Sequence, residues 1–194
     1  GAGKGTQSKF IVKKYNLYQL STGELLRNEI TNKTELGLTI STKMNNGELV
    51  SDEIVSDLIE KFISNNDYKN RLIFDGYPRN LIQVKNLENL LKKYDQKIDI
   101  VLKLVVSLDT IKKRISERKN LEQRVDDREQ IAIKRYEMFE NNIKPVIEFY
   151  KQSNLLTVVN GEKPIIEISD EISGLIESNK GWLWRITQYK YART

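Results

Sequence analysis

The chain has 194 residues, of which 39% are hydrophobic and 30% charged, a balance typical of one soluble globular domain. It contains no cysteine and no histidine, which excludes disulfides, thiolate metal sites, histidine acid–base steps and serine–histidine triads. No apolar run approaches the roughly 20 residues that a membrane span requires, and no signal peptide is recognisable. We therefore expect a cytoplasmic protein.

The net charge of +5 is concentrated at the C-terminal end. Residues 178–194 include Lys180, Arg185, Lys190 and Arg193 and no acidic residue, so the rest of the chain has a net charge of only +1. The body of the chain thus gives little electrostatic support for nucleic-acid binding. The aromatic residues of this tail are compatible with membrane or nucleic-acid contact, but we favour an incidental extension of unknown role.

Apolar, β-branched runs alternate with helical patterns, which predicts an α/β fold with a parallel sheet covered by helices on both faces. The patterns predict strands at 16–21, 72–77, 98–106 and 154–159. They predict helices at about 4–15, 51–65, 80–94, 108–118, 128–150 and 164–177. We expect Pro145 to kink or break the helix at 128–150.

The glycine-rich start, GAGKGT (1–6), is typical of the end of a phosphate-binding loop. Such a loop directs backbone N–H groups and a helix N-terminus at one anion, and a lysine adds a point charge. Lys4 would reach a transferred phosphoryl group, and Thr6 would help to hold phosphates or the water shell of a metal. The first glycine of the full motif would lie upstream of Gly1, so a flexible terminus is the alternative interpretation.

The segment DGYPR (75–79) follows a predicted buried strand. Ligands of open α/β sheets bind beyond the carboxyl ends of strands, so Asp75 and Arg79 lie where phosphate chemistry would occur. Asp75 is suited to hold the water shell of a magnesium ion. The alternative is a simple proline turn with a solvated Arg79.

A group of arginines follows in the segment 112–135. Arg114 and Arg118 are four residues apart on a predicted helix, a spacing that is mildly destabilising for like charges unless an anion lies between them. Arg124 precedes a turn, and Arg135 lies on the next helix. For each arginine alone, a solvated surface position is the alternative.

Together with STGELLR (21–27) and GELVSDEIV (47–55), these motifs occur in an order and at spacings that resemble the adenylate kinase family, from Gly1 to about Ile176. The resemblance implies a P-loop NTPase-type α/β fold in a domain at 1–177, with a small helical NMP-binding insert at about 21–50 and a short lid at about 117–127. It also implies that the N-terminal strand and the first part of the P-loop are missing from this sequence. The implied reaction is reversible phosphoryl transfer from ATP to AMP, giving two ADP.

The resemblance assigns residues to the two nucleotides. ATP is expected to contact Gly1, Ala2, Gly3, Lys4, Gly5, Thr6, Arg114, Arg118 and Lys163, with Arg114 against the adenine and Lys163 reaching it through its carbonyl. AMP is expected to contact Thr22, Arg27, Glu48, Leu49, Val50, Gly76, Tyr77, Pro78, Arg79, Gln83, Arg124 and Arg135. The catalytic charges would come from Lys4, Arg79, Arg118, Arg124 and Arg135.

The implied cofactor is Mg²⁺ bound with ATP, with no direct protein ligand and with Asp75 acting through water. We expect no structural zinc, because only KNLEQ separates Arg118 from Arg124, where long-lid relatives have a small β-module. The expected partners are ATP and AMP, without nucleic acid or membrane, and the expected state is a monomer.

Three alternatives remain open at the level of sequence. A uridylate/cytidylate kinase shares the fold, but such relatives usually have Ala and Asn at the positions of Thr22 and Gln83. A non-catalytic nucleotide-binding protein would be expected to lose basic residues that this chain retains. The third alternative is a truncated chain that binds nucleotide without efficient catalysis.

Overall fold

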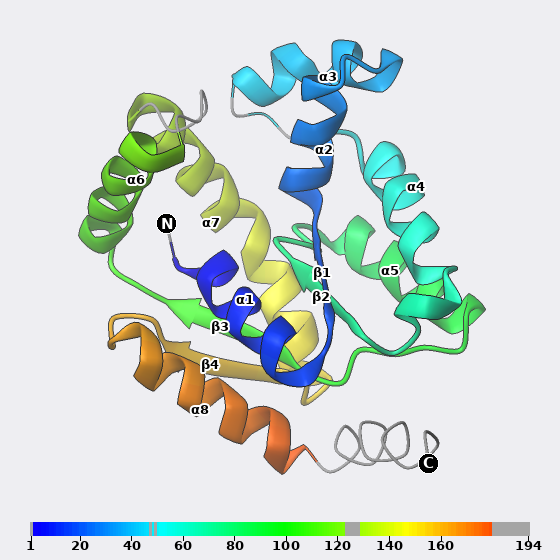
Figure 1. Ribbon diagram of the computed structural model, residues 1–194, viewed down its shortest axis with the longest axis vertical. Coiled ribbons are helices and arrows are strands. Elements are labelled where there is room, and N and C mark those ends of the chain that lie inside the picture. Colours follow the sequence, from blue (N-terminus) through cyan, green and yellow to red (C-terminus); the bar gives the residue numbers. More distant parts are fainter. Residues whose placement is uncertain (1, 47, 49, 123–128, 180–194) are drawn as a thin grey trace.

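The computed structural model describes residues 2–46, 48, 50–122 and 129–179, and within 118–140 only the course of the backbone (Figure 1). The helices are α1 (Lys4–Tyr15), α2 (Thr22–Thr31), α3 (Glu35–Asn45), α4 (Asp52–Ile63), α5 (Leu81–Lys93), α6 (Leu108–Glu122), α7 (Glu129–Gln152) and α8 (Ile165–Ser178), with a short 3-10 helix, η1, at Asn66–Tyr68. The strands are β1 (Tyr18–Ser21), β2 (Leu72–Asp75), β3 (Val101–Val105) and β4 (Leu156–Asn160).

The strands form two parallel pairs, which confirms the predicted α/β class. β1 pairs with β2, with Ser21 opposite Asp75, and β3 pairs with β4, with Val105 opposite Asn160. Parallel neighbours need a crossover connection, and helices supply it in both pairs. Among the described residues, no strand ladder joins the two pairs.

Helix α1 lies between the two strand pairs (Figure 1) and packs against both. Its Ile11 belongs to a buried cluster with Val159 of β4 and Ile172 of α8, and Ile73 of β2 packs against the same cluster. A second cluster joins β1 and β2 to helices α2 to α5, with Ile59 and Leu87 fully buried at its centre. The strands beside α1 therefore pack against two separate hydrophobic clusters.

Helices α2 and α3 project away from the strands in Figure 1. They approach each other closely at Gly37, where an added Cβ would overlap the backbone of Glu29. Thr34 begins α3 as a side-chain cap, accepting a 3.0 Å hydrogen bond from the N–H of Gly37. The helical character expected of the insert at 21–50 is thus present in α2 and α3.

Helix α7 continues through Pro145 to Gln152, so of the expected kink or break at this proline, the break does not occur. A proline inside a helix removes one backbone hydrogen bond. Tertiary packing offsets this loss, because Val146 and Tyr150, beyond the proline, are buried against Val84 of α5. Among the described residues, no helix combines the length and hydropathy needed to cross a membrane.

Candidate active site

The glycine-rich segment at the start of the chain leads into α1 at Gly3, the residue that precedes the helix. Gly3 has φ 86°, a left-handed conformation that is costly for residues with a Cβ. The following residues begin the helix, so the N–H groups of its first turn point out of its end together with the positive end of the helix dipole. No acidic residue occupies this first turn. The predicted helix start at residue 4 is confirmed, and the geometry suits an anion.

Asp75 lies beside this helix end, at the carboxyl terminus of β2. A Cβ at Gly5 would be 3.7 Å from Asp75 Oδ2, and the same oxygen accepts a 2.9 Å hydrogen bond from Gln19 Nε2 on β1. Among the described residues, no three acidic side chains gather as a metal cage. A single oriented carboxylate beside an anion site fits a magnesium ion that is held mainly by phosphates and water.

The chain turns sharply after β2. Gly76 has φ 75°, and the Tyr77–Pro78 peptide bond is cis. The turn is closed by Arg79 Nε, which donates a 2.6 Å hydrogen bond to the carbonyl oxygen of Gly76. Because Ser21 is opposite Asp75 in the ladder, Thr22 and Gly76 leave the strand pair at the same edge. The start of α2 and this turn therefore meet beyond the carboxyl ends of β1 and β2.

The amide of Gln83 is fixed on both sides. Its Oε1 accepts a 2.7 Å hydrogen bond from the backbone N–H of Arg79, and its Nε2 donates a 2.7 Å hydrogen bond to Asp52 Oδ1 on α4. Asn80 caps α5 by accepting a 2.8 Å hydrogen bond from the Gln83 N–H. The Tyr77 hydroxyl donates to the Gln83 carbonyl over 3.2 Å. Burial, and next the negative charge of Asp52, raise the pKa of Tyr77 above its ordinary value.

Helix α6 is connected to the turn after β4. Arg114 Nη2 donates a 3.0 Å hydrogen bond to the Gly161 carbonyl, and a Cβ at Gly3 would lie 3.7 Å from Arg114 Nη1. Glu162 accepts from the Ser107 N–H at 2.6 Å and from the Thr110 hydroxyl at 2.8 Å. These two hydrogen bonds, in that order, lower the pKa of Glu162. Arg114 is thereby placed between Gly3 and the turn at Gly161.

The family model for adenylate kinase matches residues 1–155. An adenylate kinase of Pelagibacter ubique is 40% identical over an alignment that covers 91% of this chain and 95% of that protein. Adenylate kinases of Fusobacterium nucleatum and Archaeoglobus fulgidus are 38% and 34% identical, covering 89% and 93% of this chain and 92% and 95% of their own lengths.

This chain belongs to the adenylate kinase family.

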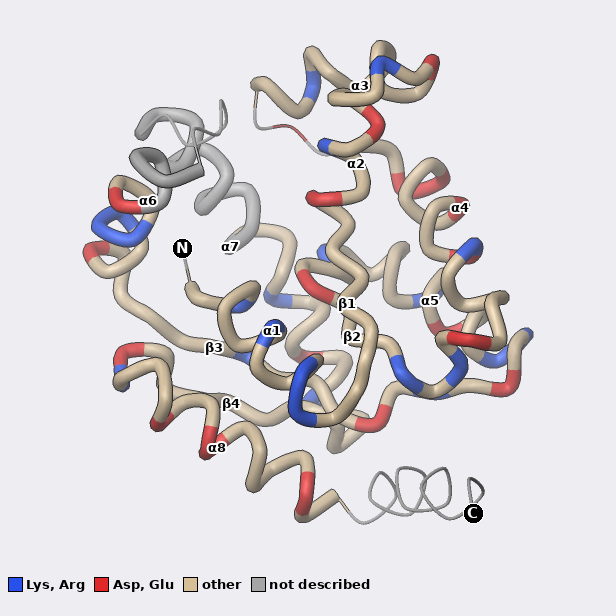
Figure 2. Tube along the Cα trace, in the orientation of Figure 1, with Lys and Arg blue, Asp and Glu red and all other residues tan. Residues whose placement is uncertain are grey.

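For a member of the adenylate kinase family, the structure brings two groups of predicted residues to one end of the strands. Ala2, Gly3, Lys4, Gly5 and Thr6 surround the start of α1, with Arg114 near Gly3. Thr22, Arg27, Gly76, Tyr77, Pro78, Arg79 and Gln83 belong to α2, to the turn after β2 and to the start of α5. Figure 2 shows basic residues on both α1 and α6.

Other predicted residues lie further out or beyond the described part. Glu48 and the buried Val50 follow α3, and the Lys163 ammonium pairs with Glu171 at 2.8 Å, which leaves the Lys163 carbonyl as the group assigned to adenine. Gly1, Leu49, Arg124 and residues 180–194 lie outside the described residues, as do the side chains of Arg118 and Arg135. The proposed lid at 117–127 and its contacts with ligand stay predictions.

Sequence reasoning missed three residues that organise this site: Asp52, Asn80 and Glu162. Asn80 and Gln83 form the pattern N-x-x-Q, a recognisable sign of a helix start in which the first side chain caps the N–H three residues later. Asp52 and Glu162 have no comparable local signal, because their partners lie on other elements.

Proposed function

We propose that this chain transfers a phosphoryl group reversibly from ATP to AMP, giving two ADP. The observation that carries the proposal is the meeting of two anion-binding elements at one end of the strands. One is the start of α1 with Lys4, which lies near Asp75, and the other is the turn that follows Asp75 in the chain and holds Arg79. All three relatives described above are named adenylate kinase.

The chemistry asks for position and positive charge more than for covalent participation. In phosphoryl transfer, negative charge spreads over the transferred group, and the attacking and leaving oxygens lie in line. We assign the ATP phosphates to the N–H groups and lysine at the start of α1, and the AMP phosphate to Arg27 and Arg79. Arg118, Arg124 and Arg135 would add charge from the lid side. No general base is required, in agreement with a chain that has no histidine.

Mg²⁺ fits this site as an ion bound with ATP. Asp75 would hold its water shell, because this carboxylate is oriented by Gln19 and lies near Gly5. The ion neutralises phosphate charge when bound. Asp75 itself contributes by fixing water on the phosphate side of β2.

Gln83 and Thr22 supply the preference for AMP in this proposal. The adenine edge offers a donor at its amino group and an acceptor at N1, and a glutamine amide offers the complementary acceptor and donor. Gln83 is only 3% exposed, so a base that reaches its amide is removed from water on that side. A mismatched base would then leave buried polar groups unpaired, which is costly.

We further infer a cytoplasmic monomer whose insert at 21–50 and lid at 117–127 close over the nucleotides. Closure would exclude water, which competes with AMP as the phosphoryl acceptor.

A coupled assay with ATP and either AMP, UMP or CMP tests the function directly. We expect far faster turnover of AMP than of either pyrimidine monophosphate. Equal or faster turnover of UMP would replace the proposal by a uridylate/cytidylate kinase. Binding of ATP and AMP without turnover would instead identify a nucleotide-binding protein.

A further inference from the structure

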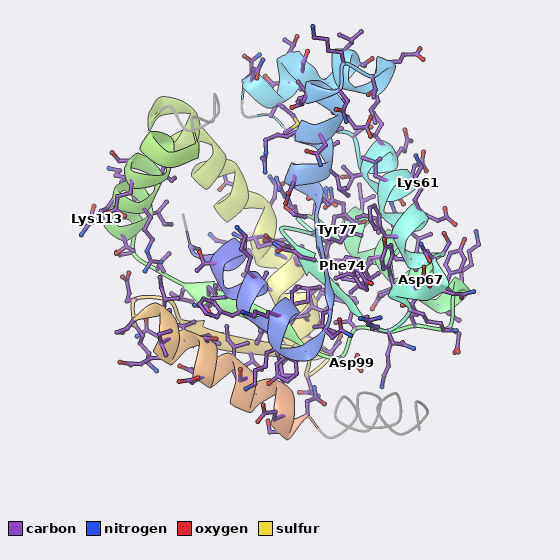
Figure 3. All side chains as sticks on the ribbon, viewed as in Figure 1. Lys61, Asp67, Phe74, Tyr77, Asp99 and Lys113 are labelled. Carbon is purple, nitrogen blue, oxygen red and sulfur yellow. The ribbon has the colours of Figure 1, made fainter. Side chains whose placement is uncertain are left out.

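Asp52 connects helix α4 to the residue that we assign to the adenine base. Its Oδ1 accepts the 2.7 Å hydrogen bond from Gln83 Nε2, and both of its oxygens are 3.1 Å from Asn80 Nδ2. Asn80 in turn accepts from the Gln83 backbone N–H. The three side chains and the Gln83 backbone N–H therefore form a closed ring of hydrogen bonds across the starts of α4 and α5, beside Tyr77, which Figure 3 labels near these helices.

This ring allows only one orientation of the Gln83 amide. An ionised carboxylate can only accept hydrogen bonds, and a backbone N–H can only donate. With Nε2 towards Asp52 and Oε1 towards the Arg79 N–H, both contacts are favourable. A flipped amide would place its oxygen against the carboxylate and its NH₂ group against the N–H. Both contacts would then be repulsive in a buried position, where unmade hydrogen bonds cost most.

The fixed orientation matters because purine bases differ at the edge that an amide contacts. Adenine offers a donor at N6 and an acceptor at N1, whereas hypoxanthine and guanine offer an acceptor at O6 and a donor at N1. Nε2 has two hydrogens and Oε1 has two acceptor sites, so one of each remains after the contacts with Asp52 and Arg79. That remaining pair matches adenine in the observed orientation and a 6-oxopurine only in the flipped one.

We propose that Asp52 is a positioning residue that holds the Gln83 amide in the orientation selecting a 6-aminopurine over a 6-oxopurine monophosphate. This inference rests on the proposed function, in which Gln83 contacts the base of AMP. Asp52 itself touches no substrate in this scheme. It acts by excluding the alternative amide orientation, and Asn80 keeps its carboxylate in place.

The test compares kcat/KM for AMP and for IMP, with ATP as donor, in the wild type and Asp52→Asn. An asparagine has nearly the same shape but can present its own NH₂ group to Gln83, so the flipped amide keeps only one of its two unfavourable contacts, the one with the Arg79 N–H. We expect the AMP-to-IMP ratio to fall about tenfold, because one hydrogen-bond mismatch is worth about that factor. The change should appear mainly in KM. Asp52→Glu keeps an acceptor-only group and should restore most of the ratio.

Two further variants separate positioning from stability. Asp57→Asn removes an acid from an exposed position of the same helix and should leave the ratio unchanged. Asp52→Ser replaces the carboxylate by a group that can donate or accept, and it provides the measurement if Asp52→Asn is unfolded at the assay temperature. A merely structural role of Asp52 would lower both kcat/KM values in parallel.

The outcomes are distinguishable. A wild type that prefers AMP, with an unchanged AMP-to-IMP ratio in Asp52→Asn and Asp52→Ser, overturns the positioning role and leaves the proposed function intact. A wild type that does not phosphorylate AMP overturns the proposed function and this inference with it. A reduced ratio in both variants, but not in Asp57→Asn, supports the assignment.

Discussion

Arg79 Nε donates a 2.6 Å hydrogen bond to the carbonyl oxygen of Gly76, so the guanidinium group is held over the end of β2 by its own turn. An arginine fixed in this way loses little side-chain freedom when a phosphate binds, and its remaining N–H groups form a planar fork suited to phosphate oxygens. The turn thus orients the positive charge of Arg79 before a ligand binds.

Replacing this arginine should affect turnover more than binding. We expect Arg79→Ala to lower kcat about a hundredfold, since removing one charge that stabilises a transition state typically has an effect of this size. Arg79→Lys should recover only part of the loss, because the charge remains without the planar fork. The same direction is expected for alanine variants of Arg118, Arg124 and Arg135. Steady-state kinetics with both nucleotides varied is the measurement.

Lys113 provides a matched control for these variants. It is an exposed cation on α6, and Figure 3 shows it on the outer side of that helix. Lys113→Ala should leave kcat unchanged. Near-normal turnover of Arg79→Ala together with a second arginine variant would mean that these residues are ordinary surface cations.

The contact between α2 and α3 should be sensitive to a single methyl group. In Gly37→Ala the new Cβ would overlap the carbonyl group of Glu29, which is backbone and cannot rotate away. We expect the free energy of unfolding to fall by about 2 kcal/mol or more, as for other overpacked sites. Gly174→Ala on α8 is the matched control, since nothing lies within 4 Å of its Cβ position.

Gly174→Ala should increase the free energy of unfolding by about 0.5–1 kcal/mol, the usual advantage of alanine over glycine within a helix. Urea denaturation of both variants gives the comparison. A Gly37→Ala protein as stable as the wild type would show that α2 and α3 separate readily.

The stability that Glu162 provides by connecting α6 to the turn after β4 should depend on pH. Hydrogen bonds from Ser107 and Thr110 lower the pKa of Glu162 in the folded protein. A carboxyl group with a lowered pKa contributes stability above its unfolded pKa of about 4.3, and this contribution is lost as pH falls through the folded pKa. Glu162→Gln should therefore melt below the wild type at neutral pH, and the difference should shrink towards acidic pH.

Thermal melting from neutral to acidic pH measures this difference, with Glu167→Gln as the control on an exposed acid at the start of α8. A difference that stays constant across this range would assign the effect of Glu162 to something other than its charge.

The Tyr150 hydroxyl is buried without a hydrogen-bond partner in the described structure, and the residue is 1% exposed. Tyr150→Phe removes only this hydroxyl, so the free energy of unfolding should rise by about 1 kcal/mol. Tyr94→Phe is the opposite case, because the Tyr94 hydroxyl donates a 2.8 Å hydrogen bond to Glu60, and this variant should be less stable.

Alkaline pH provides a second measurement for Tyr150. Burial, and next the charge of Glu88, raise the pKa of Tyr150 to about 12. A raised folded pKa means that stability is fully present below the unfolded value of about 10 and decreases as pH rises above it. The advantage of Tyr150→Phe over the wild type should therefore grow above about pH 10. A stability difference between the two proteins that does not change with pH would contradict the raised pKa of Tyr150.

The parts of the site that the sequence predicts are those made by neighbouring residues. The left-handed Gly3 before α1 and the turn from Asp75 to Arg79 are local, and their motifs identify them. The pair formed by Asp52 and Gln83 depends on how α4 packs against α5, which no spacing along the chain reveals.

Tertiary packing also explains why α7 is not broken at its proline. Pro145 favours a break in any isolated helix, but the buried Val146 and Tyr150 beyond it keep α7 continuous.

The position of α1 between the two strand pairs should influence how the protein unfolds. In the described structure the two halves share no strand hydrogen bonds, and the side chains around Ile11 on α1 contact both. Hydrogen exchange should therefore show strong protection of the α1 amides, because α1 opens only when its packing on both pairs is lost. A polyphosphate bound at the start of α1 adds its binding free energy to the helix that both pairs contact. Bound substrate would then stabilise both strand pairs through this one helix.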